Sequence, residues 1–206
     1  MCRKKDYKID LEKVGSCIMN NIYLKFPSIN EKEQWIEYIS EYRLDNPKAK
    51  PLGCTEDLNY EEWLKKILKA SRGLDLQEGR VPSTEYFLMD DEKIIGHLSI
   101  RHNIDTDFLS LYGGHIGYGV RPTERRKGYA TIMLHLAIEK CKDLGLTDIL
   151  ISCKEDNIAS ARVIENNFGI QKDLIFIPEE NTNFKKYWIN IEESLNNFEM
   201  KGSKKL

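Results

Sequence analysis

Hydrophobic residues recur along the chain with two periods, and these periods predict which segments are helices and which are strands. Apolar side chains three or four positions apart, with charged residues between them, are typical of helices that bury one face. This pattern covers residues 28–42, 57–73, 126–143 and 156–169. Alternating or nearly continuous apolar runs predict strands. Such runs cover residues 84–90, 93–101, 114–120, 147–153, 170–178 and 184–192.

Residues that commonly begin and end helices support these boundaries. Ser28 or Asn30 is placed to cap the first predicted helix, and Asp57 to cap the second. Gly145 and Gly169 follow the third and fourth helices, where glycine is the usual residue. The helix boundaries are therefore expected to be specified locally.

The order of these elements predicts an α/β (α+β) fold. The first two predicted strands are close enough in sequence to form a hairpin, and so are the last two. The strand–helix–strand unit over residues 114–153 predicts a right-handed parallel crossover. We therefore expect a mixed, mostly antiparallel central sheet of about six or seven strands with helices on both faces. Residues 7–14 alternate weakly and are either a further strand or part of an N-terminal extension.

The length of 206 residues suits one domain. We expect residues 1–195 to form it, with an N-terminal helical part over residues 1–83 and a sheet-containing core over residues 84–192. The polar residues 196–206 are predicted to be a frayed tail.

Composition excludes several classes of protein. Hydrophobic residues make up 41%, enough for a buried core, and the formal net charge of -2 argues against a nucleic-acid partner. No apolar run has membrane-spanning length, and the polar first residues lack the apolar stretch of a signal peptide. The five cysteines are scattered without a C-x-x-C pair, so we expect no disulfide framework and no metal site. A cytoplasmic protein without a membrane partner is the expectation.

Positive charge is concentrated in one turn between a predicted strand and the third helix. The first N–H groups of a helix lack intrahelical partners and lie at the positive end of its dipole, so they bind phosphate well. Gly128 has no side chain to hold a ligand away from this backbone. Arg121 and Lys127 either contact the ligand's phosphates or point into solvent. The cationic residues of the turn are Arg121, Arg125, Arg126 and Lys127.

The same turn resembles a family signature. Residues 125–130, read as RRKGYA, are similar to the R/Q-x-x-G-x-G/A motif of the GNAT superfamily, the acyl-CoA-dependent N-acetyltransferases. Residues 120–122, VRP, match the strand end that precedes this motif in the family, and Asn157 and Ser160 match its downstream N-x-x-S segment. The resemblance covers residues 84–192 and is nearest to an uncharacterised bacterial branch of predicted acetyltransferases.

This resemblance implies that acetyl-CoA is the cosubstrate, that backbone amides of the turn bind its pyrophosphate, and that its pantetheine arm enters a gap beside strand 114–120. Asn157 equally fits the N-cap of the next helix, and the two roles are compatible. Other nucleotide motifs, the P-loop and G-x-G-x-x-G at a helix start, are absent. The residues that the resemblance assigns to the cofactor are Val120, Arg125, Arg126, Lys127, Gly128, Tyr129, Ala130, Thr131, Asn157 and Ser160.

The implied reaction transfers acetyl to a primary amine by direct attack in a ternary complex. It requires a base for the amine and an acid for the leaving thiolate, and strand N–H groups near Val120 are placed to polarise the thioester. His115, His102, Tyr118 and Glu85 are the candidate bases, while a structural role is the alternative for His115 and a core position for Tyr118. The family's tyrosine acid corresponds here to Ile164. Without that acid, the proton for the thiolate would come from water or from another residue, or the thiolate would leave unprotonated.

The acceptor is expected to be a small-molecule or peptide amine, and a homodimer is possible. Residues 103–112 form a predicted polar loop whose large apolar residues either line the substrate or enter the core. The departure at Ile164 supports an alternative function, a non-catalytic acyl-CoA-binding regulatory module. A nucleic-acid binder that uses residues 121–127 is a third possibility, and the acidic balance argues against it.

Overall fold

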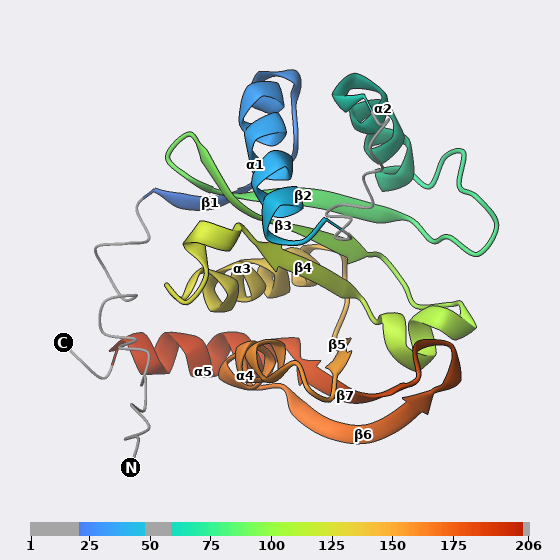
Figure 1. The fold of residues 1–206 in the computed structure, drawn as a ribbon. Coiled ribbons are helices and arrows are strands. Elements are labelled where there is room, and N and C mark those ends of the chain that lie inside the picture. Colours follow the sequence, from blue (N-terminus) through green and yellow to red (C-terminus); the bar gives the residue numbers. More distant parts are fainter. Residues whose placement is uncertain (1–20, 48–58, 204–206) are drawn as a thin grey trace, which may run out of the picture.

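The computed structural model describes residues 21–47 and 59–203, and in this part of the chain seven strands form two antiparallel sheets (Figure 1). The first sheet has the order β1-β2-β3-β4. Its strands are β1 (Ile22–Lys25), β2 (Ser83–Asp90), β3 (Lys93–Arg101) and β4 (Ile116–Val120). The second sheet has the order β5-β7-β6. Its strands are β5 (Asp148–Lys154), β6 (Ile170–Ile177) and β7 (Thr182–Asn190).

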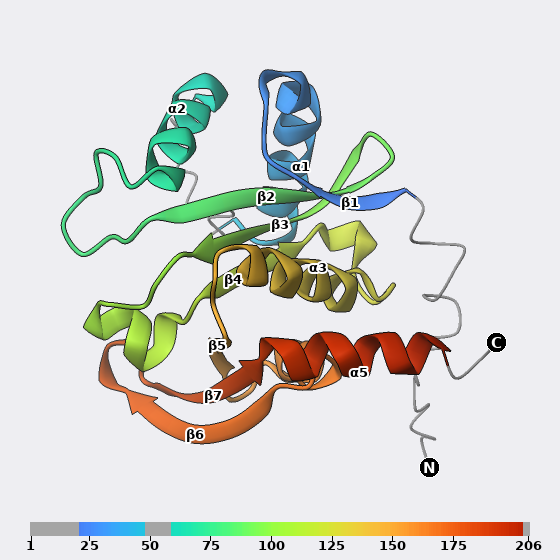
Figure 2. The same cartoon turned by 180° about the vertical axis from the view of Figure 1, so that it is seen from behind.

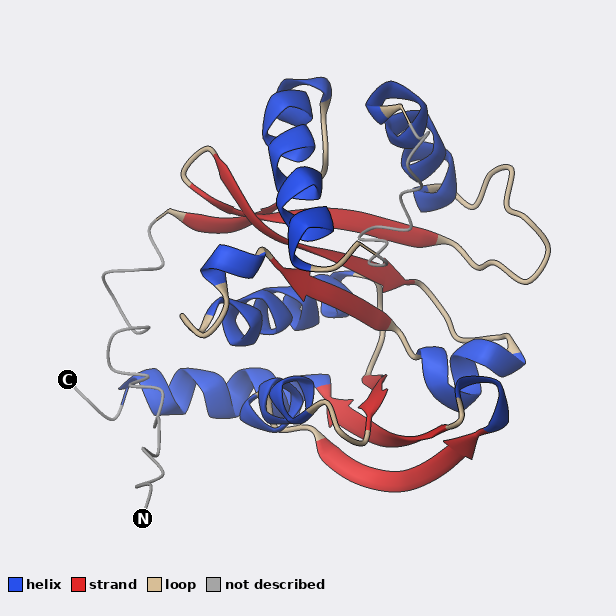
Figure 3. Ribbon diagram, in the orientation of Figure 1, coloured by secondary structure: helices blue, strands red, loops and turns tan. Residues whose placement is uncertain are grey.

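The helices complete a layered arrangement that is visible from both sides (Figures 1 and 2). Two helices cover one face of the first sheet: α1 (Lys32–Asp45) and α2 (Tyr60–Ser71). The long helix α3 (Tyr129–Asp143) lies on the opposite face, between the first sheet and the rest of the molecule. Below α3 lie α4 (Ile158–Asn166) and α5 (Ile191–Ser203) with the second sheet (Figure 3).

Each face of the first sheet has its own hydrophobic core. The face toward α3 carries aliphatic side chains, which pack against the apolar stripe of that helix. The face toward α1 and α2 is aromatic, and rings of both helices pack on Phe87, Met89 and Ile94. Because side chains alternate between the faces of a strand, β2 and β3 contribute to both cores at once.

Local capping explains where the N-terminal helices begin. Ser28 and Glu31 form a capping box at the start of a short 3-10 helix, η2 (Ile29–Glu31), which leads directly into α1. The sequence predicted Ser28 as a cap, and it caps this 3-10 turn, whereas α1 itself has no side-chain cap. The second helix begins later than predicted, at Tyr60, and its cap is Asn59 rather than Asp57. The Asn59 side chain accepts a hydrogen bond from the N–H of Glu61 at 2.8 Å, and Asp57 lies outside the described residues.

The predicted α/β fold, with mostly antiparallel strands flanked by helices, is confirmed. The seven described strands form sheets of four and three instead of one sheet. The crossover prediction would pair β4 with β5, but β5 forms its ladder with β7. The hairpins β2–β3 and β6–β7 are confirmed. The predicted strand at residues 7–14 lies outside the part that the structure describes.

Three other predicted boundaries differ from the structure. The third helix begins at Tyr129 instead of residue 126, because Gly128 has a φ of 91° and interrupts the helix. The fourth helix ends at Asn166, and Phe168, with a φ of 63°, takes the left-handed position expected of Gly169. The predicted loop at residues 103–112 contains a π-helix, η4 (Leu109–Gly113).

The prediction of a frayed C-terminal tail is wrong, because α5 extends to Ser203. Its inner side is specified by Ile191 and Ser194, which are buried, and by Leu195. Phe198 stacks on His135 of α3 with ring centroids 3.6 Å apart. This i, i+3, i+4, i+7 spacing is a helical signal, but the many polar residues around it made the segment look disordered.

The apolar residues of the 103–112 segment serve both roles that the sequence left open. Leu109 is buried, whereas Phe108 is 52% exposed and Leu111 is 47% exposed. The segment is anchored to the second sheet, because Phe108 contacts Tyr112, and Tyr112 contacts Phe184 of β7. Phe108 and Leu111 are therefore available to a ligand on this side of the molecule.

Candidate active site

The turn between β4 and α3 presents a group of unpaired backbone N–H donors. Arg126 and Gly128 have φ values of 64° and 91°, and left-handed residues of this kind bring neighbouring N–H groups to one side of the chain. Within the described residues, the N–H groups from Arg126 to Ala130 have no hydrogen-bond acceptor. A side chain at Gly128 would meet nothing within 4 Å. An open donor cluster at the positive end of α3 is a site for an anion.

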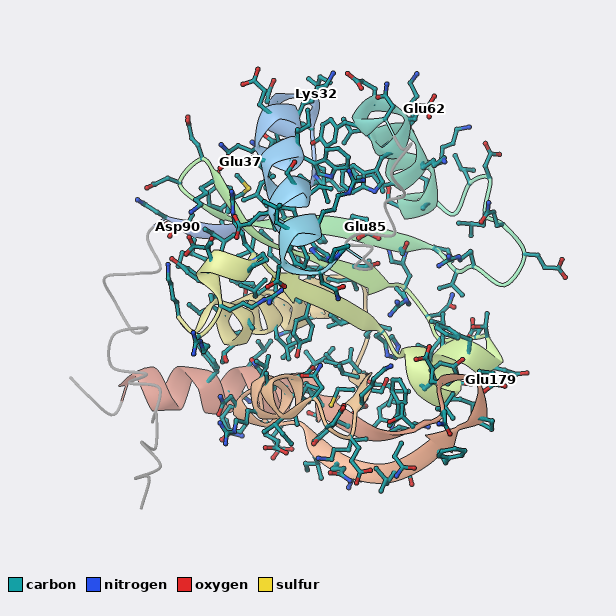
Figure 4. The ribbon with its side chains drawn as sticks, in the orientation of Figure 1. Lys32, Glu37, Glu62, Glu85, Asp90 and Glu179 are labelled. Carbon is teal, nitrogen blue, oxygen red and sulfur yellow. The ribbon has the colours of Figure 1, made fainter. Side chains whose placement is uncertain are left out.

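Most of the positive charge in this turn is already paired. Arg121 is only 3% exposed and forms ion pairs with Glu37 at 2.8 Å and Glu41 at 2.5 Å, both on α1. Glu37 is labelled on this helix in Figure 4. Arg121 therefore neither contacts a ligand nor points into solvent, and both sequence expectations for it are wrong. Lys127 pairs with Glu124 at 2.7 Å. Anion binding here consequently depends more on the amides than on the side-chain charges.

The two sheets meet at one point and then separate. The His115 N–H donates to the carbonyl of Leu150 at 2.7 Å, and the Leu150 N–H donates to His115 Nδ1 at 2.9 Å. At this contact a side chain, and not a strand carbonyl, accepts the Leu150 N–H. Burial lowers the pKa of His115, so the ring is neutral in this contact. The structure thus gives His115 the structural position that was its alternative.

Beyond His115 the free edge of β4 faces the separation between the sheets, which we call the gap. Arg101 donates its N–H to the His115 carbonyl, and Arg121 donates its N–H to the carbonyl of Ile95. These bonds assign the odd positions of β4 to β3, since bonding directions alternate along an antiparallel strand. The N–H groups of Tyr118 and Val120 consequently point into the gap, where no ladder partner takes them.

The other wall of the gap is the start of α4. Asn157 caps this helix by accepting from the Ser160 N–H at 3.1 Å. Tyr118 reaches across from β4, and its hydroxyl lies 2.9 Å from Ser160 Oγ. Burial raises the pKa of Tyr118, so its phenol is protonated at neutral pH and is a proton donor rather than a base. Ile164 is fully buried below this contact and offers no polar group.

The remaining predicted bases lie away from the gap. His102, at the end of β3, shares a 2.8 Å hydrogen bond with Thr84. Glu85 is on β2 and lies between α1 and α2 in Figure 4. Burial raises the pKa of Glu85 to about 7, although a hydrogen bond from Ser99 and the charge of Arg101 lower it. Neither residue borders the edge of β4.

One residue beside β4 was missed by the sequence analysis. His97 of β3 contacts Tyr38 of α1 through its Nδ1 atom. A Cβ at Gly119 would lie 2.8 Å from His97 and 2.7 Å from the Tyr42 hydroxyl, so Gly119 leaves room for these side chains. Protein side chains therefore approach this glycine closely. No local motif marks His97, because its partner Tyr38 is 59 positions away.

A buried histidine outside the site, His135, is expected to make the free energy of unfolding depend on pH. Burial lowers the pKa of His135 from 6.5 to about 4, and its Nδ1 has no partner. Between these values the unfolded chain binds a proton that the folded protein does not, so stability should fall as the pH drops from 6.5 to 4. This shift corresponds to roughly 3 kcal/mol at most.

Urea denaturation of the wild type and His135→Gln at pH 4.5, 5.5 and 7 measures the effect. The difference between the two proteins is the readout, because Glu85, with its raised pKa, acts in the opposite direction between pH 4.5 and about 7. The wild type should lose more stability toward pH 4.5 than the variant. Equal losses in both proteins would show that His135 does not titrate as described.

The model of the Acetyltransferase (GNAT) family matches residues 35–170. No curated protein sequence matches the chain. RimJ of Mycobacterium smegmatis, in complex with CoA-disulfide, matches with a TM-score of 0.64 and 16% identity over 88% of this chain and 89% of that chain.

Two further structures share the fold. The microcin C7 self-immunity acetyltransferase MccE, in complex with acetyl-CoA and AMP, has a TM-score of 0.59 and 18% identity over 84% of this chain and 94% of that chain. Spermidine N-acetyltransferase from Vibrio cholerae, in complex with CoA and spermine, has a TM-score of 0.57 and 14% identity over 85% of this chain and 99% of that chain. These likenesses agree with the layered architecture.

The described residues contain no group of three or more histidine, cysteine or acidic side chains placed to hold a metal ion. None of the helices in these ranges is long and apolar enough to cross a membrane. The family match covers more than half of the chain and includes both the donor turn and the gap. The chain therefore belongs to the GNAT family of acetyltransferases, whose cosubstrate is acetyl-CoA.

Proposed function

We propose that this protein transfers the acetyl group of acetyl-CoA to a primary amine by direct attack in a ternary complex. The observation that carries the proposal is the presence, within the described residues, of two groups of unpaired N–H donors in one region, one in the turn at residues 126–130 and the other on the free edge of β4. A phosphorylated acyl carrier has anionic and carbonyl oxygens that require donors at both places. The non-catalytic acyl-CoA-binding module remains the second candidate because Ile164 replaces the family's acid.

The two groups of N–H donors bind different parts of acetyl-CoA. The amides of residues 126–130 bind the pyrophosphate, and the pantetheine arm follows the gap past Asn157 and Ser160. The N–H of Val120 donates to the thioester oxygen, where negative charge develops as the amine attacks. Because these donors are held by secondary structure, they do not have to reorganise during the reaction.

Tyr118 takes over the role of the missing acid. Its phenol is protonated, lies in the gap wall and is already oriented by Ser160 at 2.9 Å. It approaches the gap from β4, whereas the family's tyrosine would approach from position 164 of α4. A protonated phenol on this wall can deliver a proton to the thiolate as the carbon–sulfur bond breaks.

The acceptor is proposed to be a small amine or the N-terminus of a peptide. The structural relatives support this range, since they include a spermidine N-acetyltransferase and RimL, a ribosomal L7/L12 alpha-N-protein acetyltransferase. The acceptor would enter from the side of α1 and α2, because α3 and α4 occupy the other side of β4.

The proposal is tested by titration calorimetry with coenzyme A and by release of free CoA thiol from acetyl-CoA. The thiol assay uses spermidine, a short peptide with a free N-terminus and an amino sugar as acceptors. We expect micromolar binding and thiol release only with particular amines. Binding without turnover across the panel would support the regulatory module, and absence of binding would refute both candidates.

A further inference from the structure

The face of the first sheet that carries α1 and α2 is not covered along its whole length. At one end, aromatic rings of both helices bury it. At the other end, Glu85, Ser99 and Gly117 form one row across β2, β3 and β4 and are only partly buried. Leu98 and Ile100, which point to the opposite face, are fully buried. The accessible end, which we call the polar floor, is on the side from which an acceptor would enter.

Arg101 at the end of β3 is a cation of this polar floor, and its guanidinium is held in one orientation. Its Nη1 donates to the carbonyls of Gly113 and Gly114, both at 3.0 Å. Its Nη2 lies 3.6 Å from the position of a Cβ on Gly117, and no other described residue comes within 4 Å of that position. Because Gly117 has no side chain and is partly exposed, the space beside Nη2 is open.

The positive charge of Arg101 has no carboxylate partner in the part of the chain that the structure describes. Its two acceptors are neutral carbonyls, whereas the buried Arg121 pairs with two glutamates. Burial lowers the pKa of Arg101, the charge of Glu85 raises it and that of Arg80 lowers it. The guanidinium nevertheless stays charged at neutral pH. A partly buried cation without an ion pair is stabilised by an anion that binds to it.

The guanidinium is close enough to the proposed thioester position for one small molecule to reach both. Gly117 is followed by Tyr118 and Val120, whose N–H groups point into the gap. The three residues from Gly117 to Val120 span about 10 Å of extended strand. A dipeptide, which extends about 7 Å, or a phosphorylated amino sugar would place its amine at the thioester and its anionic group beside Arg101.

Resting on the proposed function, we propose that Arg101 recognises an anionic group, a carboxylate or a phosphate, on the acceptor amine. The N–H groups that do not bind the two carbonyls donate to two oxygens of that group, the paired geometry that suits a guanidinium. The bonds from Nη1 to Gly113 and Gly114 keep the guanidinium in place for this contact. The substrate class is then a small amine that carries an anion several ångströms from its amino group, rather than a polyamine.

Matched acceptors that differ only in charge test the proposal in the assay of CoA thiol release. Alanyl-alanine is compared with its C-terminal amide, and glucosamine 6-phosphate with glucosamine. For at least one pair, the wild-type kcat/KM should be about 10-fold or more higher for the anionic member, as expected for a charge-assisted hydrogen bond. The pair that shows the preference distinguishes a carboxylate from a phosphate. Equal values within both pairs would overturn the proposal.

Two variants separate recognition of the anion from the structural role of Arg101. Arg101→Met should make the members of the preferred pair equivalent, whereas Arg162→Met, an exposed arginine on α4, should keep the wild-type ratio. Gly117→Asp leaves Arg101 and its carbonyl bonds in place but puts a carboxylate beside Nη2. It should also remove the preference for the anionic member. A Gly117→Asp enzyme that retains the wild-type ratio would overturn the proposal.

A binding measurement that needs no turnover distinguishes this proposal from the proposed function. The N-acetylated forms of all four acceptors are titrated into the complex of the protein with coenzyme A. The anionic member of the preferred pair should bind the wild type about 10-fold more tightly, and Arg101→Met should bind both members equally. A wild type with this binding preference but without thiol release would refute the proposed function alone. Acetylation of both members of each pair at equal rates would refute the anion site alone.

Discussion

Replacing Gly128 with valine is expected to weaken coenzyme A binding about 100-fold while the protein remains folded. Gly128 has a φ of 91°, and a side chain there would project into the open space at the start of α3. Loss of two charge-assisted hydrogen bonds to phosphate corresponds to about 3 kcal/mol, or about 100-fold in affinity. The strained backbone should itself cost about 1–2 kcal/mol of stability. Titration calorimetry and urea denaturation measure the two effects separately.

Gly145 provides a matched control at the other end of α3. It has a φ of 79°, and a Cβ there would also meet nothing within 4 Å. Gly145→Val should therefore lose a similar amount of stability but bind coenzyme A as the wild type does. If Gly128→Val retained wild-type affinity, the donor turn would not be the pyrophosphate site.

Replacing Arg121 with methionine is expected to destabilise the protein by about 3–5 kcal/mol, the usual effect of removing one partner of a buried ion pair. Arg121 also donates to the carbonyl of Ile94 at 3.3 Å, so the variant leaves that acceptor and the Glu41 carboxylate without their partner. Because Glu37 and Glu41 are on α1, this helix should detach from β4 first. Urea denaturation, monitored by tryptophan fluorescence, would report the loss.

Replacing Arg125 tests whether the burial of Arg121 is the cause of the expected loss of stability. It also pairs with α1, through Asp45 at 2.9 Å, but it is 44% exposed. Exposed pairs usually contribute less than about 1 kcal/mol, so Arg125→Met should be nearly as stable as the wild type. Similar losses in both variants would contradict the assignment of Arg121 as a buried structural residue.

The sequence was most informative where a few neighbouring residues determine a structure. The capping residue Ser28 predicted the start of the first helical segment, and the glycine after the basic residues predicted an open turn. The hairpins were predictable because short turns join strands of matching pattern. The candidate cofactor site is a local structure of this kind, and so it was located before its geometry was known.

Contacts between distant segments were not predictable in this way. Arg121 looked like a ligand-binding cation because Glu37 and Glu41 are 84 and 80 positions away. The contact between the two sheets is of the same kind, since the ring of His115 accepts the N–H of Leu150, which is 35 positions away. His97 could not be predicted for the same reason, since only the folded chain brings it together with Tyr38 and Gly119.

The pairing of the basic turn has a consequence for how coenzyme A is captured. Of the cations between residues 121 and 127, Arg121, Arg125 and Lys127 each have a carboxylate partner. Their fields therefore largely cancel a few ångströms from the surface, and long-range steering of an anion toward the turn is weak. Recognition then begins at contact, so the association rate should change little with ionic strength, unlike that of enzymes that attract phosphates through exposed cations.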